Sequence, residues 1–95
     1  MSEDNKEEFY KRLHSELVNS TLWPSEYLYK FIVPSDEEKI QTIIGFFDNM
    51  GAIINTKTSG KGNYTSISIN VKMKSADHVI EKYQQVGNVP GVISL

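Results

Sequence analysis

The 95-residue chain contains no cysteine. This absence excludes disulfides, thiolate catalysis and cysteine-bound metal, and it disfavours a small secreted domain held together by disulfides. The chain also lacks an excess of positive charge. Ten basic and twelve acidic residues leave a formal net charge of -2, so no overall field gathers nucleic acid or an anionic membrane surface. We therefore expect a protein of the reducing cytoplasm.

Long hydrophobic runs are missing as well. The first eight residues, MSEDNKEE, are acidic and polar, unlike the basic start and apolar centre of a signal peptide. No apolar run approaches the roughly 20 residues that cross a bilayer. These absences predict a soluble protein with no membrane partner, and the length suits one small domain with a single two-layer core.

Catalytic and metal-binding patterns are absent from the sequence. Its two histidines, His14 and His78, are far apart, and neither has a second ligand at metal-binding spacing. No nucleophile elbow, metal-binding helix motif or cofactor fingerprint is present. We expect no catalytic residue, no metal site and no cofactor, and therefore a protein that is not an enzyme.

Apolar residues recur with helical and strand periods along the chain, and glycine, proline or capping residues separate the segments. We predict helices over residues 4–19, 36–50 and 76–86, and strands over residues 27–33, 52–58, 64–73 and 89–95. After the first helix this is a βαββαβ order, in which right-handed crossovers place both later helices on one face of an antiparallel sheet. The predicted fold class is α+β, a ferredoxin-like two-layer sandwich with an extra N-terminal helix.

Residues at the helix ends predict where the later helices start and stop. Ser35 and Glu38 form a capping-box pattern, in which the Ser35 hydroxyl accepts a hydrogen bond from the Glu38 amide. The acidic residues 36–38 are therefore interpreted as a helix start rather than a metal or acid-base site. Gly51 supplies a left-handed residue that ends this helix, and Ser75 caps the next one.

Strand alternation divides the side chains between the two faces of the sheet. In the first strand, the bulkier set of Tyr27, Tyr29 and Phe31 is expected to point towards the helices. The opposite, open face is expected to hold Leu28, Lys30 and Ile32 from the first strand and Tyr64, Ser66, Ser68, Asn70 and Lys72 from the third. Because this face carries a leucine and an isoleucine, we expect a helix, a second subunit or a ligand to cover it.

The N-terminal helix is a candidate for that cover. Phe9, Leu13 and Leu17 lie four residues apart, and Tyr10 and Val18 widen the apolar stripe. Such a stripe requires a surface on which to be buried.

The strand-to-strand turn carries the most distinctive motif. Gly60 and Gly62 free the backbone for a tight turn, and residues 59–68 read SGKGNYTSIS. This run resembles the YbeD-like family of small bacterial proteins. The Trp23-Pro24 pair, the start of an aromatic first strand at residues 27–30 (YLYK) and the hydrophobic C-terminal strand are similar too. The resemblance covers residues 23–95 and implies a ferredoxin-like, ACT-related domain there, with residues 1–22 as a separate acidic segment and amphipathic helix.

The resemblance implies candidate ligand- or partner-binding residues in the motif, to which the open face adds Lys30. The candidates are Ser59, Lys61, Gly62, Asn63, Tyr64, Ser66 and Lys30. A Gly-Lys-Gly turn beside serines can offer backbone amides and one ammonium group to an anion, but the same residues also suit a purely structural turn. In the structural reading, Asn63 adopts the left-handed conformation and Tyr64 packs at the base of the hairpin.

The sequence therefore predicts a non-catalytic regulatory or interaction module with an unidentified protein or small-molecule partner, and it leaves a homodimer open. The family label of lipoate regulatory protein implies a link to lipoate metabolism. The alternative is weak binding of RNA or another anion by lysines expected to cluster near the hairpin and open face, namely Lys30, Lys57, Lys61, Lys72 and Lys74. Asn63 and Thr65 stand where an RNA-recognition domain carries stacking aromatics, which argues against sequence-specific nucleic-acid binding.

Overall fold

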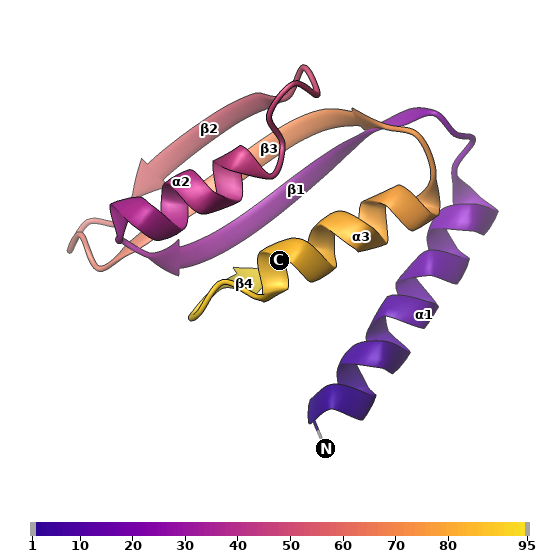
Figure 1. Ribbon diagram of the computed structural model, residues 1–95, viewed down its shortest axis with the longest axis horizontal. Coiled ribbons are helices and arrows are strands. Elements are labelled where there is room, and N and C mark those ends of the chain that lie inside the picture. The colour runs from indigo at the N-terminus through magenta and orange to yellow at the C-terminus, as the bar shows by residue number, and fades with distance from the viewer. Residues whose placement is uncertain (1, 95) are drawn as a thin grey trace.

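The computed structural model describes the backbone of residues 2–94 and the side chains of residues 7–94. Figure 1 shows its elements, which are α1 (Ser2–Ser20), β1 (Ser25–Pro34), α2 (Glu37–Gly45), β2 (Ile53–Thr58), β3 (Tyr64–Met73), α3 (Ala76–Gly87) and β4 (Ile93–Ser94). The predicted order of helices and strands is confirmed. The last strand is shorter than the predicted span of residues 89–95, of which Leu95 lies outside the described residues.

The four strands form one sheet in the order β2-β3-β1-β4. Every neighbouring pair is antiparallel, and β1 and β3 pair over ten residues, from Ser25 opposite Met73 to Pro34 opposite Tyr64. β4 adds only two pairs at the far edge of β1. The prediction of an α+β protein built on an antiparallel sheet is confirmed.

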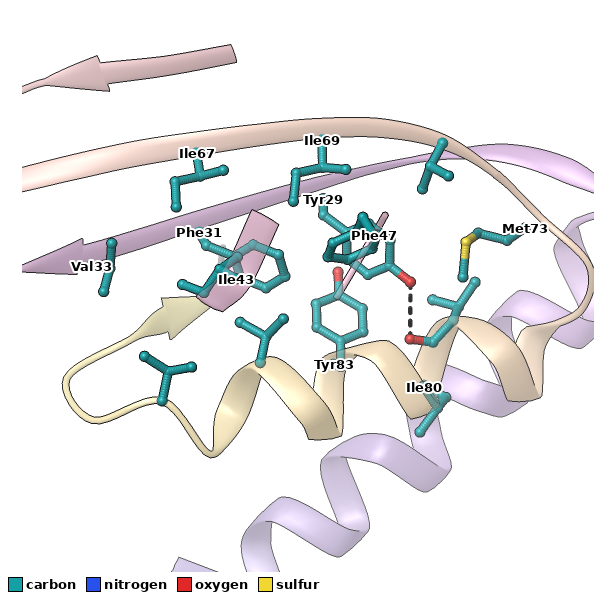
Figure 2. Packing of buried hydrophobic residues seen from close by; sticks show 14 of the residues in the cluster. Tyr29, Phe31, Val33, Ile43, Phe47, Ile67, Ile69, Met73, Ile80 and Tyr83 are labelled. Carbon is teal, nitrogen blue, oxygen red and sulfur yellow. Dashed lines mark hydrogen bonds between the residues drawn. The ribbon is translucent and has the colours of Figure 1, made fainter. Parts of the chain in front are cut away.

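The hydrophobic core lies between the sheet and the helices, and Tyr29 is at its centre (Figure 2). The ring of Tyr29 lies 5.1 Å from that of Phe47, just after α2, and 4.9 Å from that of Tyr83 in α3. Its hydroxyl donates a hydrogen bond of 3.1 Å to the carbonyl of Val79. One face of the sheet therefore receives side chains from both the α2 region and α3.

The predicted division of the sheet faces is confirmed in both long strands. Tyr29 and Phe31 are buried and Tyr27 is half-buried, while Leu28 and Lys30 between them are exposed. In β3 the buried set consists of Thr65, Ile67, Ile69, Val71 and Met73. Because side chains alternate along a strand, the remaining residues of β3 lie on the open face.

The N-terminal helix does not cover the open face. α1 packs beside α3 in the helical layer (Figure 1), where Leu17 is buried and Tyr10 and Leu13 are partly buried against the core. Phe9 and Val18 are 55% and 52% exposed, so the predicted broad stripe is wrong at its margins. A helix that rests on another helix meets it along a narrow line, and residues to either side of that line stay in solvent.

The start of α2 differs from the predicted capping box. Asp36, not Ser35, is the N-cap, and its carboxylate accepts hydrogen bonds from the amides of Glu38 at 2.9 Å and Lys39 at 3.4 Å. Ser35 is still tied to β3, because its hydroxyl forms a 2.8 Å hydrogen bond with that of Thr65. The helix therefore begins one residue later than predicted, where the chain leaves the sheet.

Replacing Asp36 with alanine is expected to lower the free energy of unfolding by about 1 kcal/mol, since two amides at the helix start lose their acceptor. Hydrogen exchange should report the site directly, with faster exchange at the amides of Glu38 and Lys39. Ser35→Ala is the matched control and should leave protection of those two amides unchanged. Loss of protection in Ser35→Ala would instead identify Ser35 as the cap.

The end of α2 also differs from the prediction. The helix stops at Gly45 with Phe46 as its C-cap, and residues 46–51 form turns rather than continuing the helix. Gly51 adopts the predicted left-handed conformation with φ 71°, and Asn49 adopts it too with φ 63°. Lys82 of α3 donates a 2.7 Å hydrogen bond to the carbonyl of Phe46. This contact satisfies an otherwise free carbonyl and holds the turn against α3.

Candidate ligand or partner site

The hairpin between β2 and β3 is closed by its own hydrogen bonds. The amide of Ser59 donates to the carbonyl of Tyr64 at 2.8 Å, and the amide of Gly62 donates to the carbonyl of Ser59 at 2.9 Å. The Ser59 hydroxyl accepts from the amide of Tyr64 at 3.3 Å. Ser59 therefore has a structural role in the turn, whatever else it binds.

Gly62 is the left-handed residue of this turn, with φ 77°. The expectation that Asn63 adopts this conformation is wrong, because Asn63 is already aligned with the neighbouring strand: its carbonyl accepts a 3.0 Å hydrogen bond from the amide of Ser35. Gly60 does not adopt a left-handed φ, so its backbone conformation does not require a glycine.

Replacing Gly62 with alanine is expected to lower the free energy of unfolding by about 1 kcal/mol, because a Cβ is strained at positive φ. Gly60→Ala is the matched control. A Cβ at Gly60 meets nothing within 4 Å, so this variant should match the parent or exceed it slightly by restricting the unfolded chain. Urea denaturation of the pair checks the prediction, and equal losses would contradict the assignment of the strained position to Gly62.

A shallow hollow of about 200 Å³ lies at the base of the hairpin. It is lined by Ile32, Lys57, Thr58, Ser59, Gly60, Tyr64 and Ser66. Three of the predicted site residues, Ser59, Tyr64 and Ser66, are therefore brought together there. The other predicted site residues of the motif, Lys61, Gly62 and Asn63, lie in the turn beyond the lining. Lys30 lies two residues before Ile32 in β1.

Four lining residues, Ile32, Lys57, Thr58 and Gly60, are not among the predicted site residues, although Lys57 is one of the lysines of the anion-binding alternative. Ile32 and Lys57 are cross-strand partners of Ser66. The hairpin register could have identified Lys57, since a turn closed between Ser59 and Tyr64 places Lys57 opposite Ser66. Ile32 could not be found this way, because its pairing with β3 joins segments distant in sequence.

The open face of the sheet extends from this hollow across β2, β3 and β1. Directly paired residues point to the same face, so the register places side chains in rows across it. The rows are Leu28, Asn70 and Ile53; Lys30, Ser68 and Asn55; and Ile32, Ser66 and Lys57. Leu28 is 51% exposed and Ile53 67% exposed. Within residues 2–94, the helices pack elsewhere and leave these apolar side chains in solvent.

The predicted lysines do not form one cluster. Lys30 and Lys57 lie on rows near the hairpin, whereas Lys72 lies six residues further along β3 than Ser66, a separation of about 20 Å. Lys72 and Lys74 line a different hollow, between the turn after α2 and the start of α3. The prediction of a single basic region is wrong because Lys30, Lys57 and Lys61 lie towards the hairpin end of the sheet, whereas Lys72 and Lys74 lie at the opposite end.

Outside this surface, one pair of ionisable side chains lies close together. Packing of α1 on α3 brings Nε2 of His14 within 2.7 Å of the Asp77 carboxylate, a proximity that sequence separation does not reveal. Among the side chains described, no three of histidine, cysteine, aspartate or glutamate gather to hold a metal ion. No helix in the described part of the chain has the length and apolar character needed to cross a membrane.

Comparison with known proteins places the chain in a family. A family model described as a protein of unknown function (DUF493) matches residues 19–95. The match includes every strand, α2 and α3, while nearly all of α1 precedes it. No curated protein and no solved structure matches the chain. The chain belongs to the DUF493 family.

Proposed function

We propose that this protein is a non-catalytic module that binds a partner protein or a small ligand through the open face of its sheet and the hairpin hollow. The observation that carries the proposal is the uncovered face, on which Leu28 and Ile53 are more than half exposed. Ile93 of β4, 51% exposed, extends the apolar area to the other edge. Exposed apolar side chains grouped on one face are typical of an interaction surface.

The fold supports the proposed kind of module. We assign it to the ferredoxin-like, ACT-related folds, since the strand order read from β4 is 4-1-3-2 with βαβ units interleaved. The resemblance to YbeD-like proteins adds a regulatory role, with lipoate metabolism as its setting in the cytoplasm. Residues 19–95 carry that role, and α1 is an addition to the helical layer.

The alternative is binding of RNA or another anion at the same surface. Lys30 and Lys57 lie on the open face and Lys61 in the adjoining turn, while Glu26 is a carboxylate at the opposite end of β1. Tyr64 is 50% exposed at the hairpin and could stack on a base. Such binding would weaken steeply as salt rises, whereas apolar docking would not.

An NMR amide-shift titration of the full chain with lipoate, amino acids, nucleotides and short RNA tests the proposal, alongside the mass in solution. If the partner is a small ligand, amide shifts should concentrate on the open face and the hairpin for one ligand class. If the partner is a second copy of the chain, the same amides should shift as protein concentration rises. The double variant Lys61→Ala/Tyr64→Ala should remain folded and weaken that response.

The matched control, Phe9→Ala/Lys11→Ala, removes one exposed aromatic and one lysine from α1 and should leave the response unchanged. If Lys61→Ala/Tyr64→Ala unfolds the protein, the motif is a structural turn. If shifts instead gather in the helical layer, the open face is not the binding surface.

A further inference from the structure

A second hollow, of about 480 Å³, lies at the other end of β3 from the hairpin. The turn after α2, the end of β3 and the first turn of α3 form its walls. It shares no lining residue with the hairpin hollow. A ligand of this hollow would therefore lie apart from the hairpin hollow, although Lys72 reaches it from the open-face set of β3, where it pairs with Glu26 of β1.

The lining of this hollow is strongly cationic. Lys72, Lys74 and Lys82 line it with Asp48 as the one carboxylate, so three positive charges and one negative charge leave +2. The whole chain, by contrast, has a formal net charge of -2. Ammonium groups that share a hollow repel one another, and a bound anion would relieve that repulsion.

Lys82 is held in position to take part. Its Nζ donates to the carbonyl of Phe46 at 2.7 Å and to Oε1 of Gln85 at 3.1 Å. An ammonium group has three N–H donors, so one is left for a ligand. The lysine also lies over the ring of Phe47, 5.7 Å from its centroid. Its charge is therefore positioned by the fold rather than swinging freely in solvent.

His78 also lines the hollow. Its Nδ1 is buried away from solvent, so this nitrogen is not the atom that faces a ligand. His78 also lies in the first turn of α3, whose N-terminal end favours a negative charge nearby.

The charge and shape of the lining select a class of anion. A phosphate monoester carries about -1.5 to -2 at neutral pH, which matches the +2 of the hollow. Lysine binds phosphate as a point charge, whereas a carboxylate is matched best by the planar fork of arginine, and no arginine lines the hollow. Phe46 and Met50 supply an apolar wall for an organic substituent. The volume falls within the range of about 300–1,000 Å³ of small-molecule sites.

We infer that the hollow between the turn after α2, the end of β3 and the start of α3 binds a small organic phosphate monoester. Lys72, Lys74 and Lys82 hold the phosphate, and Phe46 and Met50 contact the organic part. The inference does not depend on the function proposed for the open face.

Titration of the full chain with phenyl phosphate, followed by amide shifts in low salt, tests the inference. Shifts are expected at Lys74, His78 and the turn after α2, and not at the hairpin. Phenyl sulfate has nearly the same shape but only one negative charge. Its affinity should be lower than that of phenyl phosphate by a factor of about ten or more. Inorganic phosphate should bind at the same amides with lower affinity, because it lacks the apolar contact.

Lys74→Gln is the informative variant, because the side chain is exposed in the described structure and its loss should leave folding intact. It should weaken phenyl phosphate binding about fivefold. Lys57→Gln removes the same charge at the hairpin and is expected to have no effect. Equal weakening in both variants, equal affinity for phenyl sulfate, or no shift at millimolar phenyl phosphate would each overturn the inference.

Discussion

Phe31→Ala is expected to lower the free energy of unfolding by about 3–5 kcal/mol, a large part of the total of about 5–15 kcal/mol for a small domain. Phe31 is 1% exposed. Its ring stacks on that of Tyr29 with centroids 5.6 Å apart and lies 6.0 Å from that of Tyr83. Removing the ring leaves a cavity between the sheet and α3 that neighbouring aromatic rings are too rigid to fill.

Phe9→Ala is the matched control for this loss. The chemical change is the same, but Phe9 is 55% exposed on α1, where its ring lies edge-on to that of Tyr10. The expected loss is about 0.5 kcal/mol or less. Urea denaturation monitored by circular dichroism measures both variants. A similar loss for the two would mean that Phe9 is buried against the domain and that α1 packs differently.

Stability is expected to fall steeply above pH 10, because burial raises the pKa of both Tyr29 and Tyr83 above its usual value of 10.0. A hydrogen bond of 2.8 Å between the hydroxyls of Tyr27 and Tyr83 adds to the shift at Tyr83. Above pH 10 the unfolded chain releases protons that the native protein retains. The stabilisation is therefore fully present below pH 10 and is lost as pH rises.

The expected slope is about 1.4 kcal/mol of lost stability per pH unit for each of the two tyrosines. Urea denaturation at several pH values between 9 and about 11.5 measures it, with tyrosinate absorbance reporting ionisation. Tyr29→Phe keeps the ring and removes one of the two hydroxyls. The part of the slope that the two tyrosines contribute together should therefore fall by about half. At neutral pH the same variant should cost about 1 kcal/mol, for the lost bond to Val79. An unchanged slope in Tyr29→Phe would contradict the assigned role of Tyr29.

Much of the fold could be predicted because the strands alternate clearly. Tyr29 and Phe31 on one side and Leu28 and Lys30 on the other determine which face is buried, whatever the strand pairs with. The cap of the last helix was equally predictable, since Ser75 accepts from the amide of His78 at 3.2 Å. These are local properties of short segments.

The start of α2 shows where local reasoning failed. Ser35 and Asp36 are both good N-caps, and the sequence favoured Ser35 because Glu38 follows at the capping-box spacing. In the structure the hydroxyl of Ser35 forms a hydrogen bond with that of Thr65, thirty residues away, and Asp36 is therefore the N-cap. A contact across the sheet thus moved the helix start by one residue.

The candidate sites show the same division on a larger scale. Ser59, Tyr64 and Ser66 could be grouped in advance because one hairpin carries them all. The cationic hollow could not, because it joins Lys72 and Lys74 to Lys82 and Asp48 from two other segments. On sequence alone, Lys72 and Lys74 are placed with the hairpin lysines and Lys82 is not included.

The sequence by itself determined the order of the elements, the buried and open faces of the sheet and the position of the hairpin turn. These follow from side-chain alternation, helical periodicity and the conformational freedom of glycine, all of which act over a few residues. The tertiary structure decided that α1 lies on α3, that the open face stays uncovered and that the lysines divide between two ends of the sheet. Those features depend on strand register and helix packing, which join residues far apart in the chain.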